Sequence, residues 1–272
     1  MTISTSERSD NRLQNADKAG HKGKMRLWAV LFWLLVWQAA SMLLGQEILL
    51  ASPLASLIRL AELVTEAGFW RSIGFSAVRI VGAFAAAVCS GVVLAALSAG
   101  HVRIRELLEP LAAAVKATPV ASFIIIVLIW IPSKNLAFVI SFLMVFPVIY
   151  ANVLQGIMNT DRQLLEMAQV FRVTAGRLVR YIYVPSVMPF FRSACSLGLG
   201  LCWKSGIAAE VIGQPSGSLG ERLYSAKIYL ETPDLFAWTA TIIAVSVIFE
   251  KLFMMVLDAV AGRIEGRSAA VE

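Results

Sequence analysis

Six long apolar runs recur along this chain, and they limit the possible folds more than any other feature. The runs lie at roughly 26–45, 74–98, 112–131, 135–157, 189–212 and 236–258. A helix needs about 20 apolar residues to cross a hydrocarbon core about 30 Å thick, and each run is close to that length. Inside lipid, a helix satisfies its own backbone polar groups. The pattern therefore predicts an all-α, polytopic membrane protein with about six transmembrane helices.

The overall composition agrees with a membrane location. Hydrophobic residues make up 58% of the 272 residues and charged residues only 15%, far from the balance of a soluble domain. The formal net charge is +6, but the basic residues are spread over loops and ends, and no patch interleaves them with aromatic residues. We therefore expect contact with membrane lipid and not with nucleic acid.

The chain divides into two parts. Residues 1–24 are rich in Ser, Asn, Asp, Lys and Gly and hold almost no large apolar side chain, which predicts a disordered N-terminal tail. Residues 25–272 hold the six runs and are expected to form one transmembrane domain. Between the first two runs, Ser52-Pro53 opens a segment with the spacing of an amphipathic helix, which we expect to lie on the surface without crossing.

Lysine and arginine are distributed unevenly between the two sides of the predicted bundle. If the N-terminus is cytoplasmic, the outer loops carry only Arg59, Arg71, Lys134, Arg222 and Lys227. Most of the other basic residues then fall on the inner side. Cytoplasmic loops carry an excess of Lys and Arg, so this bias predicts a multi-pass protein of the cell membrane. It also predicts that both termini, including the tail, and the loop at 158–188 are cytoplasmic.

The loop between the fourth and fifth runs carries two helix-start signals. Thr160 followed by Gln163 matches a capping box, in which a hydroxyl and an amide satisfy backbone donors, so a helix should begin near Asp161. Thr174 is a second cap candidate. The helix that it opens should stop before Pro185, because the residue preceding a proline favours extended geometry. The loop is therefore predicted to form a helix-turn-helix.

The same loop contains a spaced motif. Glu166-Met-Ala168 is followed at fixed distances by Ile182 and Val184-Pro185. This order resembles the cytoplasmic signature of the permeases of binding-protein-dependent ABC importers. That signature reads Glu-Ala-Ala, a glycine four residues beyond the last alanine, then an apolar residue and Leu-Pro. Here Arg172 holds the glycine position and the nearest glycine is Gly176; glycine reaches positive φ freely, whereas arginine does so only at a cost.

The resemblance extends beyond the loop, over about residues 50 to 258. The segments 76–84, 209–213 and 217–220 are similar to those of the nitrate, sulfonate and taurine branch. Membership would imply a MetI-like permease domain at 25–272 with its coupling loop at 158–188. Such a subunit moves a small solute by alternating access, and the branch takes nitrate-, sulfonate- or taurine-like anions or small organic nutrients.

The resemblance also implies partners and an absence of catalysis. ATP and Mg²⁺ would bind a separate ABC ATPase subunit, so this chain would need no cofactor of its own and would not be an enzyme. An extracytoplasmic solute-binding protein would deliver the cargo. One chain of six spans is half of the usual pore, which implies a homodimer.

Particular residues of the loop take roles from the resemblance. Glu166 would be the charged anchor of a short helix seated in a groove of the ATPase, with Leu165, Ala168 and Phe171 as its apolar contacts. Gly176 and Pro185 would set the angles through which motion passes to the spans. The full set of expected coupling residues is Leu165, Glu166, Ala168, Phe171, Arg172, Gly176, Ile182 and Pro185.

Four residues inside the predicted spans are candidates for the translocation pathway. Lys204 and Glu210 lie deep in the fifth run, where ionisable groups are costly and face a cavity or a partner. Six residues apart, they should lie on different faces of one helix. Lys204 either attracts an anionic cargo or pairs with another span or snorkels. Pro119 and Pro147 interrupt the third and fourth runs; broken spans often line a pathway, although membrane helices also carry proline without any function.

Three other classes of protein compete with this interpretation. An intramembrane enzyme is disfavoured because His21 and His101 are the only histidines and neither belongs to a metal-ligand or nucleophile-base pattern. No phosphate-binding Gly-x-x-x-x-Gly-Lys-Ser/Thr segment occurs. An ion-coupled secondary transporter would tolerate the buried charges and broken spans but would not need the loop. A membrane scaffold without transport activity is the third possibility.

Overall fold

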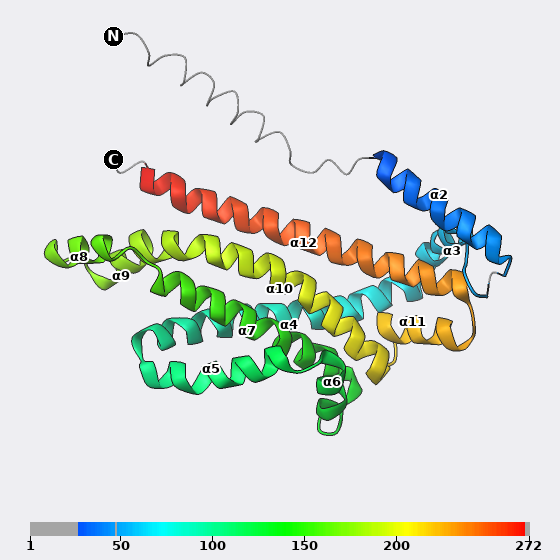
Figure 1. Ribbon diagram of the computed structural model, residues 1–272, viewed down its shortest axis with the longest axis horizontal. Helices are drawn as coiled ribbons and strands as arrows, with labels where there is room; N and C mark the ends of the chain where they lie inside the picture. Colours follow the sequence, from blue (N-terminus) through cyan, green and yellow to red (C-terminus); the bar gives the residue numbers. More distant parts are fainter. Residues whose placement is uncertain (1–26, 47, 270–272) are drawn as a thin grey trace, which may run out of the picture.

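The computed structural model describes residues 27–46 and 48–269, and the expected tail at 1–24 lies outside them. Every regular element in this part of the chain is helical. Four long helices run side by side along the molecule (Figure 1): α4 (Ala67–Gly100), α7 (Ser133–Met158), α10 (Val184–Gly213) and α12 (Thr232–Ala269). Each is part of a helix long and apolar enough to cross a membrane. They confirm the second, fourth, fifth and sixth predicted runs.

The first and third runs form less regular elements. The first becomes α2 (Leu27–Leu44), a shorter apolar helix. The third does not form the single straight crossing predicted for 112–131. It is divided between α5 (Val102–Ala117) and α6 (Val120–Leu128), which are bent by 107° from one another. The bend lies at Thr118, whose extended backbone is the geometry that the following Pro119 imposes.

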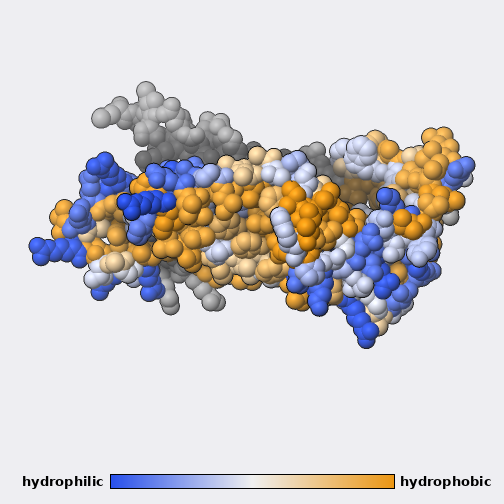
Figure 2. Space-filling model, turned by 90° about the horizontal axis from the view of Figure 1, so that it is seen from below, coloured by the Kyte–Doolittle hydropathy of each residue, from blue (hydrophilic) through white to orange (hydrophobic). Residues whose placement is uncertain are grey.

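Short helices lie at the two ends of the long bundle (Figure 1). One end carries α8 (Arg162–Val170) and α9 (Ala175–Leu178), followed by the π-helical turn η1 (Val179–Tyr183). We call this the loop end. The other end carries α3 (Pro53–Thr65) and α11 (Leu219–Ile228), and we call it the far end. In the view of Figure 2, apolar surface covers the middle of the molecule and hydrophilic residues gather toward the two ends, as expected for a bundle that spans lipid.

The core forms where α4 and α10 pack against α7. Glycines permit the close approach. A Cβ at Gly91 of α4 would lie 2.9 Å from the Cγ2 of Ile149, and one at Gly206 of α10 would lie 2.6 Å from the Oγ of Ser141. Ser141 also donates a hydrogen bond of 3.0 Å to the carbonyl of Cys202. Small residues at helix contacts are the usual means of tight packing in membranes, where no hydrophobic effect drives helices together.

The amphipathic helix predicted after Ser52 is confirmed as α3. The Ser52 hydroxyl accepts from the backbone N–H of Ala55 at 3.1 Å and caps the helix. Arg59 then binds the carboxylate of Asp234 through Nε and Nη2, which attaches α3 to the first turn of α12. This hydrogen bond, with a second one to Glu62, raises the pKa of Arg59 above its ordinary value.

Candidate functional site

The first helix of the loop begins one residue later than a Thr160 cap would place it. Its N-cap is Asp161, whose carboxylate accepts from the backbone N–H of Gln163 at 2.8 Å. The Thr160 hydroxyl instead donates to the carbonyl of Gly156, 3.4 Å away, and the side chain is buried. The capping box expected at Thr160 and Gln163 is therefore wrong, although the helix begins near Asp161 as predicted. An aspartate one position further on provides the stronger acceptor for the first free backbone donors.

The turn after α8 has a left-handed backbone conformation that favours glycine, but Arg172 occupies this position. Arg172 has φ of 49°. Its N–H bonds to the carbonyl of Gln169 at 3.1 Å, and the N–H of Val173 bonds to that of Ala168 at 2.9 Å. These two bonds form a Schellman motif, which normally places glycine at the left-handed position. The turn is thus preserved at the expense of backbone strain on an arginine.

Gly176 does not supply this turn. It lies inside α9, and a Cβ there would meet nothing within 4 Å. The expectation that Gly176 sets an angle of the loop therefore finds no steric or conformational basis. The reversal of direction is made at Arg172 instead.

The two faces of α8 differ in what they contact. Leu165 lines a cavity beneath the loop and Ala168 is 3% exposed, so both face the bundle. The opposite face presents Val170 and Phe171, which are 79% and 75% exposed. Glu166 is also on the open side, paired with Arg162 at 3.0 Å. The surface that a soluble partner can reach therefore includes Glu166, Val170 and Phe171. The Leu165 and Ala168 side chains, which the resemblance implied as contacts, face the bundle instead.

The second helix of the loop does not stop before Pro185. The helical path is continuous from Ala175 to Gly213, with η1 directly before the proline. A proline removes a backbone donor and crowds the carbonyl of the preceding turn. The π turn has a wider spacing, and the N–H of Val184 bonds back five residues to the carbonyl of Val179. The proline is accommodated within a continuous helix, and Ile182 is buried in this turn.

Lys204 and Glu210 lie on different faces of α10, as their spacing predicts. Lys204 is exposed, on the same face as Leu197 and Leu201. It forms no ion pair with any carboxylate in the described part of the chain. Glu210 is completely buried. Of these two residues, only Lys204 is therefore accessible from outside the subunit.

Glu210 joins three helices. Its Oε2 accepts a hydrogen bond of 2.7 Å from the Ser76 hydroxyl of α4 and one of 3.2 Å from the backbone N–H of Gly220 in α11. The Ser76 hydroxyl in turn accepts from the N–H of Leu219 at 2.9 Å. The other carboxylate oxygen, Oε1, is buried and has no partner among the described residues. This cluster ties the start of α11 to α4 and α10 at the far end.

Sequence reasoning did not find the partners of Glu210. Ser76 and Gly220 both lie in the segments that resemble the nitrate, sulfonate and taurine branch, but the sequence assigned no role to either residue. The only signal in the sequence was that Glu210, an ionisable residue inside a span, and the two segments that contain Ser76 and Gly220 had no assigned contact. Ser76 lies 134 residues from Glu210, so this contact is hidden until the helices are packed.

The two prolines occupy opposite environments. Pro119 is exposed at the bend between α5 and α6, and Pro147 is buried inside α7.

Among the described residues, no group of three His, Cys, Asp or Glu side chains is placed to hold a metal ion.

Long apolar helices, a tightly packed three-helix core and a short helical hairpin at one end define a multi-pass membrane protein. The chain belongs to the family of binding-protein-dependent transport system inner membrane components, whose pattern matches residues 87–267. It is therefore a permease subunit of an ABC importer.

Several of its curated relatives are named as taurine or sulfonate permeases. The chain is 23% identical over 220 residues to the taurine transport system permease protein TauC of Escherichia coli, covering 79% of this chain and 80% of the relative. A probable ABC transporter permease protein of Brucella melitensis is 28% identical over 210 residues, covering 75% and 83%. The formylaminopyrimidine transport permease protein ThiX of Halalkalibacterium halodurans is 24% identical over 208 residues, covering 76% and 82%.

Proposed function

We propose that this subunit couples ATP hydrolysis on a separate ATPase to alternating access through the open face of α8. The observation that carries the proposal is the two-sided character of that helix. Its inner face is anchored by Ala168, while Glu166, Val170 and Phe171 face outward. The exposed ion pair of Glu166 with Arg162 contributes little to stability and can be exchanged for a partner's groups. Two large apolar side chains with one carboxylate suit a groove on a soluble protein.

Motion of α8 has a direct route to the spans. From α9 onward the helix runs unbroken through η1 into α10, so a displacement at the loop end is transmitted along a rigid element. We assign the loop end to the cytoplasm, in accordance with the Lys and Arg bias of the sequence. ATP and Mg²⁺ then belong to the ATPase, and this chain carries no cofactor.

The complete importer would contain two permease chains, two ATPases and an extracytoplasmic binding protein. In a homodimer, the exposed face of α10 with Leu197, Leu201 and Lys204 would be available to the second copy or to the pathway. Relatives of the chain are named for chemically different solutes, taurine and formylaminopyrimidine. We therefore propose a small solute of the nitrate, sulfonate or taurine kind, or a small organic nutrient, with Lys204 favouring an anion.

A crosslinking experiment tests the coupling surface. Phe171 is replaced by a photoreactive phenylalanine analogue in the full-length chain co-expressed with its ATPase. We expect a crosslink to the ATPase from position 171. The same analogue at Tyr229, which is 74% exposed at the far end, is the matched control and should give none. Crosslinking from 229 and not from 171 would overturn the orientation and the docking surface together.

A reconstitution distinguishes the ion-coupled alternative. In proteoliposomes, the importer should accumulate solute only with ATP inside and with the ATPase present. Uptake by the purified chain alone under a proton or sodium gradient would support the ion-coupled secondary transporter instead.

A further inference from the structure

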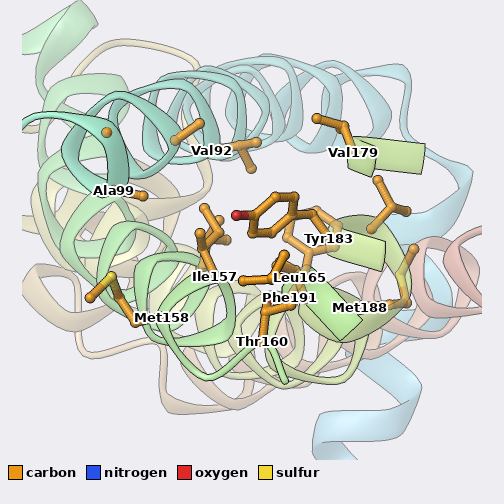
Figure 3. Close-up of a pocket in the computed structure, with 15 residues that line it drawn as sticks. Val92, Ala99, Ile157, Met158, Thr160, Leu165, Val179, Tyr183, Met188 and Phe191 are labelled. Carbon is orange, nitrogen blue, oxygen red and sulfur yellow. The ribbon is translucent and has the colours of Figure 1, made fainter. Parts of the chain in front are cut away.

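A partly open cavity of about 670 Å³ lies at the loop end and is lined by residues of α4, α7, α8, η1 and α10 (Figure 3). Val92 and Ala99 of α4, Ile157 of α7 and Phe191 of α10 form much of its wall, and Leu165 of α8 reaches it from the loop. This is the size of cavities that hold small organic ligands. The walls are mainly apolar, which disfavours a small hydrophilic anion as the natural occupant.

One polar group in the cavity has no assigned partner. The Tyr183 side chain projects into the space with its hydroxyl foremost (Figure 3), and that hydroxyl forms no hydrogen bond with a described residue. The only other side-chain hydroxyl in the lining, that of Thr160, already donates to the Gly156 carbonyl. The cavity therefore suits a long apolar group that carries an acceptor near one end.

The lining segments are flanked by exposed arginines. Arg180 lies between the lining residues Val179 and Tyr183, and Arg177 precedes them in α9. Arg103 follows the lining residue Gly100 by three positions. None of these arginines forms an ion pair with a described carboxylate. Unpaired guanidinium groups beside an apolar cavity at the end of membrane helices match an anionic lipid headgroup.

We propose that this cavity holds an acyl chain of an anionic phospholipid, with the lipid ester at the Tyr183 hydroxyl and the headgroup at Arg177 and Arg180. The assignment to the cytoplasmic leaflet rests on the orientation in the proposed function, but lipid binding itself does not. The occupied cavity would place lipid against the π turn and beneath Leu165, at the base of the coupling loop.

The test uses the full-length chain in nanodiscs of phosphatidylcholine. A small fraction of phosphatidylglycerol with a photoreactive acyl chain is the probe, and crosslinked peptides are located by mass spectrometry. We expect label in residues 92–100 and 179–191, in excess of that on the lipid-facing surface of α12. Ala96→Trp fills the cavity and should reduce this label about tenfold, equivalent to about 1.4 kcal/mol of binding free energy.

Matched variants separate the cavity from general lipid contact. Ala85 is exposed on the same helix outside the cavity lining, so Ala85→Trp should leave the label unchanged. Changing Arg177 and Arg180 to Gln together should abolish the preference for phosphatidylglycerol over an equally photoreactive phosphatidylcholine. Arg71→Gln at the opposite end of α4 should preserve it. Tyr183→Phe, which removes only the hydroxyl, should weaken the label even if Ala96→Trp fails to fold.

Three results would overturn the proposal. One is label spread evenly over all lipid-facing helices. Another is label insensitive to both Ala96→Trp and Tyr183→Phe. The third is equal label from the two lipids. All three readouts are independent of uptake and of ATPase docking, so failure of the proposed function would leave them interpretable.

Discussion

Gly220 lies so close to Glu210 that no side chain fits between the two helices that carry them. A Cβ at position 220 would be 2.4 Å from the Cβ of Glu210 and 2.6 Å from its carbonyl carbon. The absence of a side chain lets the backbone N–H of Gly220 reach the Glu210 carboxylate. Steric fit and a buried hydrogen bond therefore depend on the same glycine.

Gly220→Ala should displace α11 from α10. The added methyl group would meet backbone as well as side-chain atoms, so relaxation must move a helix, and we expect destabilisation of about 1–3 kcal/mol. The lowered Tm can be measured by thermal unfolding of the purified chain in detergent. Gly200→Ala in α10 is the control: a Cβ there meets nothing within 4 Å, and better helix propensity should leave Tm unchanged or slightly raised. Equal Tm values for the two variants would contradict the contact.

Glu210→Ala should cost more stability than Glu210→Gln. Alanine leaves the Ser76 hydroxyl and the Gly220 N–H without their acceptor, a loss of about 1–3 kcal/mol for a buried donor. Glutamine keeps an acceptor oxygen of nearly the same shape. Thermal unfolding should therefore rank the wild type first, then Gln, then Ala. Ser76→Ala should lower Tm about as much as Glu210→Ala. Ser90→Ala should leave Tm almost unchanged, because the Ser90 hydroxyl bonds only within its own helix.

Arg172→Gly should stabilise the loop. The left-handed backbone costs an L-residue about 1–2 kcal/mol, and the greater freedom of glycine in the unfolded chain offsets part of the gain. We expect a net increase of up to about 1 kcal/mol in the stability of the turn. It can be measured as slower hydrogen exchange at the amides of positions 172 and 173. Arg177→Gly should instead destabilise the loop, because position 177 lies within α9 and glycine weakens a helix by about 1 kcal/mol. Faster exchange in both variants would show that the turn does not have this strain.

Lys204→Met should weaken transport of an anionic cargo without loss of folding. The side chain is exposed and forms no ion pair with a carboxylate of the described residues, so its removal leaves none of them unpaired. We expect KM for uptake to rise about tenfold, the equivalent of about 1.4 kcal/mol, while Lys204→Arg retains most of the affinity. Lys227→Met, an exposed lysine of α11, should leave KM unchanged. Unchanged KM in Lys204→Met would remove Lys204 from the pathway.

The apolar runs predicted the long helices well, because burial in lipid depends on the composition of about 20 consecutive residues. The runs around Pro119 and Pro185 were predicted less well. At Pro119 the preceding residue became extended and the span was broken, whereas at Pro185 a π turn kept the helix continuous. The same residue type had opposite effects because neighbouring contacts, which the sequence does not display, decide whether a lost backbone bond is replaced.

The side chains of the loop show the same difference between what the sequence predicts and what tertiary contacts decide. Its position and its motif were visible from Glu166 to Pro185 in the sequence. Which of its apolar residues face a partner was not, since Leu165 and Phe171 are equally hydrophobic and only the docking of α8 on the bundle turns one inward and the other outward.

The sequence alone determined that this chain is a helical membrane protein with a charged loop between its fourth and fifth apolar runs, because hydropathy and short motifs are local properties. The tertiary structure alone decided that Glu210 is a buried link to Ser76 and Gly220 while Lys204 is open to a ligand. It also decided that three helices and the loop line an apolar cavity. Those outcomes depend on which helix faces meet, and that is set by close packing between residues more than a hundred positions apart.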